Sequence, residues 1–146
     1  MKTPRAWIWS ALVLYWLGVA YDIAWHGVIQ PGFEGETFDE MLRHLRTVHL
    51  PIYLGVAALA VTTAWALVDH VRRGRRGAAA PLAFAGGLLA AAGEGWHAYS
   101  HLQLTTHMGP VAFLLGFVGM LIVLGALIAG GRAERREREQ RLLTPP

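Results

Sequence analysis

Six of the seven histidines, with one aspartate and one glutamate, stand near the ends of long apolar segments. They are Asp22 and His26 closing the first segment, His44 and His49 opening the second, Glu94, His97 and His101 closing the third, and His107 opening the fourth. Imidazole and carboxylate groups are ligands of transition metals. Because the chain has no cysteine, a metal would have to be held by nitrogen and oxygen.

Two of these groups have the spacing of a single helix face. Asp22 and His26 are four residues apart, and the group from Glu94 to His101 follows the pattern i, i+3, i+7. Each set can therefore direct its side chains toward one point. Within a membrane helix, an ionised carboxylate costs about 2.5–3.5 kcal/mol, so both acids need partners, and a cation would supply one.

The pair His44 and His49 is less regular. Five residues separate the two, so they would diverge on a straight helix. Glu40, however, stands four residues before His44, and Pro51 can bend the entry of the following helix. Either histidine is a candidate ligand.

The elements that must position these groups are predicted to be membrane helices. Of the 146 residues, 54% are hydrophobic and 16% are charged, and the mean hydropathy is +0.36. A crossing needs about 20 mostly apolar residues, and four stretches qualify: about 6–28, 49–70, 80–101 and 109–130. We expect one all-α membrane domain over 1–146, a four-helix bundle with a polar connection at 31–48 and a charged helical tail at 131–146.

Small residues favour close contact between the last two helices. They form rows at Ala83, Gly87 and Ala91, and at Ala112 and Gly116. Close packing there would bring the polar groups together, and metal sites are often built inside such bundles.

Positive charge predicts the orientation. Eleven of the 13 lysine and arginine residues precede the first helix, separate the second from the third or follow the fourth. Cytoplasmic loops retain such residues, so both termini should be cytoplasmic and the histidines should face outward from a bacterial-type inner membrane. The pI near 9.8 comes from these arginines, which would contact the anionic headgroups of the lipid bilayer. No nucleic-acid motif is found.

Simpler interpretations compete with a metal site. Residues 1–20 resemble a signal peptide, although the apolar run continues to Ile29. Single histidines are common at membrane interfaces, and Asp22 with His26 could form a structural ion pair. Tyr21 and Tyr99 could orient ligands, but we interpret them as interface aromatics. Interfacial preference alone would populate both membrane faces, yet His70 is the one histidine on the cytoplasmic side.

Two stretches resemble the C subunit of the particulate methane and ammonia monooxygenases. Residues 22–29 read Asp-Ile-Ala-Trp-His-Gly-Val-Ile, and residues 49–53 read His-Leu-Pro-Ile-Tyr. Residues 95–99 read Gly-Trp-His-Ala-Tyr, followed by His-Met-Gly-Pro at 107–110 and Gly-Phe-Val at 116–118. These matches span about half of the chain, which is shorter than the family subunit and would correspond to its core helices.

The resemblance implies copper ligands at Asp22 and His26, whereas the family's third histidine, thirteen residues further on, matches neither His44 nor His49. The family's second group pairs an asparagine and a histidine four residues apart with a histidine fourteen residues later. In this chain Gly93 stands at the asparagine position relative to His97, with Glu94 displaced by one residue and His107 following after ten.

The function implied is that of a membrane copper protein, within an oxygen-dependent system that oxidises small apolar or nitrogenous substrates. Such an enzyme would need partner membrane subunits or a homo-oligomer. Zinc, iron and nickel suit the same ligands. A metal-delivery protein without turnover and a haem-binding bundle are the alternatives, and the carboxylates beside the histidines disfavour haem. A proton pathway is disfavoured, because Thr62 and Thr63 are the only polar residues between Ala57 and Ala66 and none occurs from Leu82 to Ala92, so no continuous polar route is formed.

Overall fold

The computed structural model describes residues 4–33, 35–104 and 109–143. Its order is α1 (Pro4–Ala24), a π-helical turn (Trp25–Ile29), α2 (Phe38–Thr47), α3 (Leu50–Arg72), α4 (Ala79–Leu102) and α5 (Gly109–Leu143). No strand occurs in these ranges, so the predicted all-α class is confirmed.

Three helical stretches are long and apolar enough to cross a membrane: Arg5–Ile29, Leu50–Arg72 and Val111–Leu143. Many of their apolar side chains face outward, and Leu17, Val61 and Leu114 are 63%, 69% and 56% exposed. Exposed apolar surface of this extent suits a lipid environment. The length and composition of these helices therefore indicate a helical membrane protein.

Helix α4, expected as a crossing over 80–101, is not among the three. It is 24 residues long, about 36 Å at the usual rise per residue. Its glycines and alanines are only weakly apolar, and Glu94, His97 and His101 lie in its C-terminal half. The same polar side chains that are candidate ligands on α4 also lower the hydropathy of this helix.

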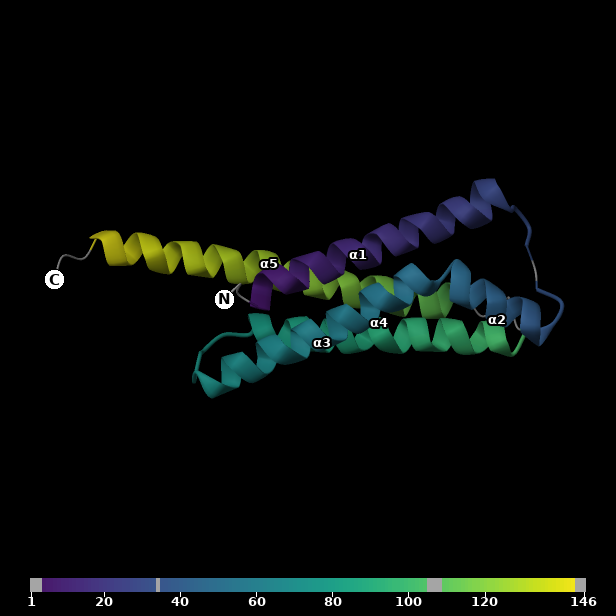
Figure 1. Cartoon of the computed structure of the whole chain (residues 1–146). Coiled ribbons are helices and arrows are strands. Elements are labelled where there is room, and N and C mark those ends of the chain that lie inside the picture. The colour runs from purple at the N-terminus through teal and green to yellow at the C-terminus, as the bar shows by residue number, and fades with distance from the viewer. Residues whose placement is uncertain (1–3, 34, 105–108, 144–146) are drawn as a thin grey trace.

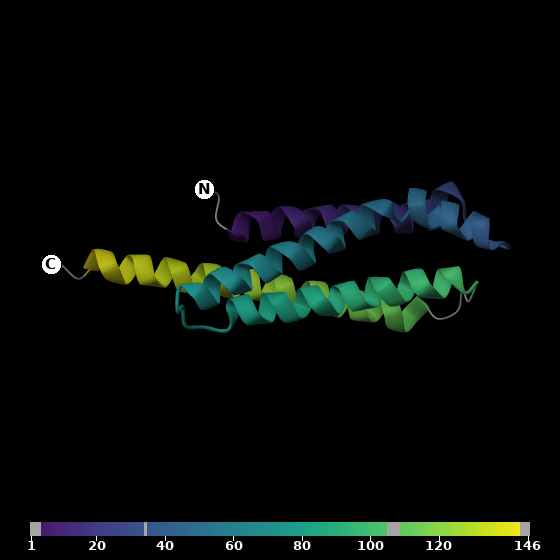
Figure 2. The same cartoon turned by 60° about the horizontal axis from the view of Figure 1, so that its bottom comes forward.

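The long helices pack as two antiparallel pairs (Figures 1 and 2). Helix α1 packs on α3, α4 packs on α5, and α3 and α4 join the pairs. Tyr15, Leu12, Leu59, Met120 and Val123 form the centre of the apolar core, each at most 1% exposed.

Small residues permit the closest helix contacts, as predicted, but α4 uses a different row. A Cβ at Gly93 would lie 2.4 Å from the backbone nitrogen of Gly116, and one at Gly119 would lie 2.4 Å from that of Ala90. The α4 row that meets α5 is thus Gly86, Ala90 and Gly93. Gly87, from the predicted row, instead faces Thr63 of α3, because a helix turns 100° per residue.

Helix α2 lies within the segment expected to be a polar connection. Its first turn is closed by a capping box, in which the Thr37 hydroxyl accepts from the Glu40 backbone N–H and the Glu40 carboxylate accepts from the Thr37 N–H, both at 3.3 Å. Met41, His44 and Leu45 form its buried face. Hydropathy alone predicts a polar connection here and not a helix. The capping box at Thr37 and Glu40 is the signal in the sequence that indicates α2.

The basic link between α3 and α4 and the charged end of α5 lie at the other end of the molecule from α2 (Figure 1). Arg5 of α1 forms an ion pair of 3.0 Å with Glu134 and donates to the carbonyl oxygen of Leu127 at 2.9 Å. Helix α5 continues beyond residue 130 to Leu143, so the expected helical tail is observed as far as that residue.

Candidate metal centre

The first pair of candidate ligands lies where α1 changes its helical pitch. Asp22 is in the last turn of α1, and His26 is in the π-helical turn, which is closed by an N–H···O bond of 2.8 Å from Gln30 to Trp25. The His26 Nε2 and Asp22 Oδ1 atoms are 3.5 Å apart. The His26 side chain is 35% exposed, the most open of this first group.

His44 and His49 converge because the chain breaks between α2 and α3. His44 lies on α2, and His49 precedes the first residue of α3, where Pro51 fits because helix N-terminal N–H groups need no intrahelical partner. Their Nε2 atoms are 3.0 Å apart. The divergence expected on a straight helix does not occur, and both histidines, not one of them, enter the cluster.

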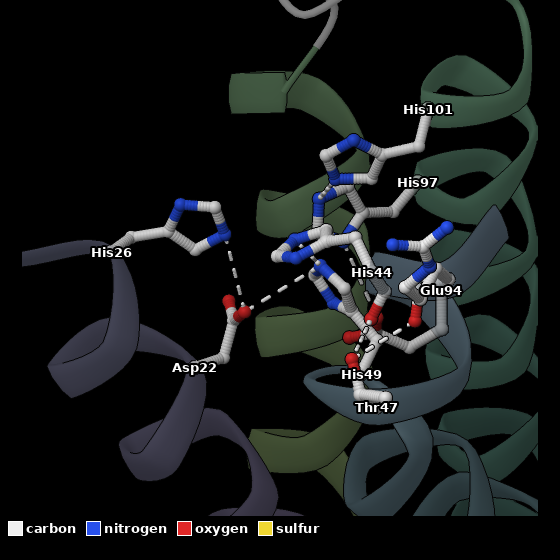
Figure 3. Close-up of polar contacts among 9 residues, drawn as sticks. Asp22, His26, His44, Thr47, His49, Glu94, His97 and His101 are labelled. Carbon is white, nitrogen blue, oxygen red and sulfur yellow. Dashed lines mark hydrogen bonds and ion pairs between the residues drawn. The ribbon is translucent and has the colours of Figure 1, made fainter. Parts of the chain in front are cut away.

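Asp22 joins the two pairs into one group. Its Oδ1 atom lies 3.5 Å from the His49 Nε2 as well as from His26 (Figure 3). Asp22, His26, His44 and His49 each offer one ligand atom, and these four atoms all lie within 4.8 Å of one another. Such a set can surround a single metal ion.

Helix α4 adds a second group beside the first. The Nε2 atoms of His97 and His101 are 3.0 Å apart, and the His97 Nδ1 lies 3.6 Å from the Glu94 Oε2. The ring centroid of His49 lies 5.2 Å from that of His97 and 5.0 Å from that of His101. Seven of the eight candidate residues therefore adjoin one another, and His107 lies outside the described residues.

The cluster holds most of the unsatisfied buried polar atoms. Within the described part of the chain, seven buried side-chain nitrogen or oxygen atoms have no hydrogen-bond partner, and six of them lie in the cluster or directly beside it. They are Asp22 Oδ1, His44 Nδ1, His49 Nδ1, Tyr53 OH, Glu94 Oε2 and His101 Nδ1. An unsatisfied buried polar group costs about 1–3 kcal/mol, so this concentration suits a site that binds a polar or charged ligand.

The protonation state of His44 also suits metal binding. Its imidazole is only 4% exposed. Burial, with smaller contributions from His26 and His97, lowers the pKa of His44 to about 4. The imidazole is neutral near pH 7, and a neutral imidazole is the form that binds a metal.

Two aromatic side chains, Trp25 and Phe33, pack against His44. The ring centroid of His44 lies 4.6 Å from that of Trp25 and 4.8 Å from that of Phe33, and the Trp25 and Phe33 rings are 5.2 Å apart.

Glu40 is not part of the cluster. Its carboxylate caps α2. The i, i+4 spacing of Glu40 and His44 therefore does not make Glu40 part of the cluster.

Two tyrosines beside the cluster were missed in the sequence. Tyr15 donates a short hydrogen bond to the Glu94 Oε1, and the Tyr53 ring stacks on His49 with centroids 6.0 Å apart. Tyr53 follows His49 by four residues and Tyr15 precedes Asp22 by seven, so helical spacing could have identified both. Tyr21 and Tyr99 are 43% and 61% exposed, as interface aromatics would be.

Comparison with known proteins gives no relative from which a function could be transferred. No protein-family model matches the chain, and neither a curated protein nor a solved structure matches it. The functional argument therefore depends on the site itself.

Proposed function

We propose that the protein is a membrane metal-binding protein whose primary ligands are Asp22, His26, His44 and His49. The proposal is carried by one observation, the convergence of their four ligand atoms within 4.8 Å. Asp22 lies on α1, His26 in the π-helical turn, His44 on α2 and His49 at the start of α3, so helical periodicity alone does not bring them together.

Charge supports a cation at this place. Asp22 and Glu94 bring two carboxylates into one cluster of imidazoles, and Glu94 is only 6% exposed. In a medium of low dielectric constant, buried charges need compensation. When both carboxylates are ionised, one divalent cation balances their charge.

We propose copper as the metal. Nitrogen and oxygen ligands without thiolate suit Cu(II), and the affinity order of divalent metals places copper first, with zinc and iron as alternatives. The resemblance to the copper monooxygenase C subunit favours the same metal. Glu94, His97 and His101 would complete the first site or hold a second ion.

We also propose that all four long helices cross a bilayer. Helix α4 packs along α5 and α3, so only part of its surface would face lipid and it would need less hydropathy of its own, while Leu82 and Leu88, each 50% exposed, would form its lipid-facing side. The arginine-rich segments and the cluster lie at opposite ends of the molecule. With the arginines in the cytoplasm, the cluster would face outward from a bacterial-type inner membrane.

Two roles suit such a centre. A subunit of an oxygen-dependent oxidation system would need partner membrane subunits or a homo-oligomer, and the family resemblance favours this role. A metal-delivery protein would need an accessible ligand, which the 35% exposure of the His26 side chain favours. Haem is disfavoured, since axial ligands lie on opposite faces of a porphyrin whereas the paired Nε2 atoms are 3.0 Å apart.

Metal content tests the proposal. Protein purified without added metal should retain copper, and the variants Asp22→Ala, His26→Ala and His49→Ala should lose it. His70→Ala is the matched control, because His70 lies in the last turn of α3, at the end away from the cluster. Copper retained by all three cluster variants would overturn the ligand assignment, and His26→Ala, at a partly exposed position, limits the risk of misfolding.

A further inference from the structure

Glu94 has two oxygen atoms in different environments. Its Oε1 accepts the hydrogen bond of Tyr15, which comes from α1. Its Oε2 is buried, has no hydrogen-bond partner among the described residues and lies 3.6 Å from the His97 Nδ1. One side of the carboxylate is thus fixed by a neighbouring helix, and the other side faces an imidazole.

The surroundings of Glu94 are shaped to hold it in this position. A Cβ at Gly116 of α5 would lie 2.9 Å from the Tyr15 hydroxyl and 3.0 Å from the Glu94 Oε1. The absence of a side chain there leaves room for the hydrogen bond between Tyr15 and Glu94. Three helices, α1, α4 and α5, therefore meet at this carboxylate.

The contact with His97 has a consequence for the imidazole proton. A carboxylate only accepts hydrogen bonds, so it favours the form of His97 that carries its proton on Nδ1. The separation of 3.6 Å is longer than a hydrogen bond, so the carboxylate favours this form of His97 through its attraction for the Nδ1–H. The Nε2 of His97 is then left without a proton.

The second histidine of α4 is consistent with this assignment. The Nε2 atoms of His97 and His101 are 3.0 Å apart, so in the metal-free protein one of them must donate to the other. If His97 Nε2 accepts, the donor is the Nε2–H of His101, and the unpartnered buried Nδ1 of His101 is an acceptor without a proton. Unsatisfied acceptors are tolerated more often than unsatisfied N–H groups.

We infer that Glu94 is a positioning residue, held by Tyr15, that keeps the His97 proton on Nδ1 and so presents the His97 Nε2 to a metal. This inference rests on the proposed metal-binding function. It changes the expected role of Glu94, which spacing alone suggested as a ligand. Metal-bound histidines commonly donate their other N–H to a carboxylate, and loss of that partner typically lowers metal affinity by about 10–100-fold.

Nitrogen NMR of ¹⁵N-histidine-labelled, metal-free protein in detergent tests the inference. The wild type should carry the His97 proton on Nδ1. In Glu94→Gln, the amide oxygen can still accept from Tyr15 while its NH₂ faces His97, so the proton should move to Nε2. Asp69→Asn is the matched control, since it makes the same carboxylate-to-amide change near the end of α3 that lies away from the cluster, where Asp69 pairs with Arg73, and it should leave His97 unaltered.

A Cu²⁺ titration of the same variants separates this inference from the proposed function. Glu94→Gln should bind Cu²⁺ about 10–100-fold more weakly than the wild type. Two results would overturn the inference. One is a wild-type His97 that carries its proton on Nε2, and the other is a His97 proton that stays on Nδ1 in Glu94→Gln. Failure of the wild type to bind Cu²⁺, with the His97 proton on Nδ1, would overturn the metal site and leave the contact of Glu94 with His97 standing.

Discussion

Tyr15 is buried and Tyr53 is partly buried beside the cluster, and the hydroxyl groups of the two tyrosines differ in their partners. Tyr15 donates to Glu94, whereas the Tyr53 hydroxyl has no partner among the described residues. Removing a hydroxyl that makes a hydrogen bond leaves its partner unsatisfied, while removing an unpartnered hydroxyl removes a cost. The same Tyr→Phe change should therefore have different effects at the two positions.

In metal-free protein, Tyr15→Phe should lower the free energy of unfolding by about 1–3 kcal/mol, and Tyr53→Phe should leave it unchanged or raise it. Denaturation in detergent, followed by circular dichroism, measures both values, and each variant serves as the control for the other. A loss of about 1 kcal/mol or more in Tyr53→Phe would mean that its hydroxyl has a partner in the folded protein.

For single residues, the sequence predicted which side chains of one helix lie together better than it predicted the contacts between different helices. The spacing of Asp22 with His26, and of Glu94 with His97 and His101, identified residues that do adjoin one another. The choice between His44 and His49 could not be made, because it depends on the angle between two helices. Local periodicity carries no information on that angle.

Helices α4 and α5 approach each other closely at glycine positions that leave no room for a side chain. Gly119 of α5 lies against the backbone of Gly86 and Ala90, and a Cβ there would approach the Ala90 nitrogen to 2.4 Å. Gly125, six residues further along the same helix, has open space around it. The two glycines test the contact between α4 and α5 independently of helix propensity.

Gly119→Ala should destabilise the protein by about 1–3 kcal/mol, because α4 and α5 must move apart. Gly125→Ala should be neutral or stabilise the helix by about 0.5–1 kcal/mol. Thermal unfolding in detergent compares the two midpoints. Equal midpoints would show that the helices do not approach each other at Gly119.

At the scale of elements, the sequence predicted the long helices and missed α2. Apolar runs of about 20 residues are visible without any tertiary information, so α1, α3, α4 and the apolar part of α5 could be predicted within a few residues, and the charged continuation of α5 was predicted as a helical tail. Helix α2 has only ten residues, and its signals are the cap at Thr37 and Glu40. Short amphipathic helices are stabilised mainly by tertiary packing, which hydropathy does not report.

For the whole molecule, the separation of charge gives an orientation that labelling can test. The protein has no cysteine, so a single introduced cysteine is a unique label. Gln30→Cys lies near the cluster and Arg76→Cys in the basic link between α3 and α4, both at exposed positions. In intact cells, a membrane-impermeant maleimide should label the first variant only, and both after lysis. The reverse pattern would place the cluster in the cytoplasm.

The central claim is that imidazoles from separate elements hold one metal centre with Asp22. X-ray absorption of protein purified without added metal tests it most directly. We expect a copper edge, a first shell of nitrogen and oxygen only at about 2 Å, and the outer-shell scattering of several imidazole rings. A protein without bound metal, or a metal surrounded by oxygen ligands with no imidazole signal, would contradict the claim.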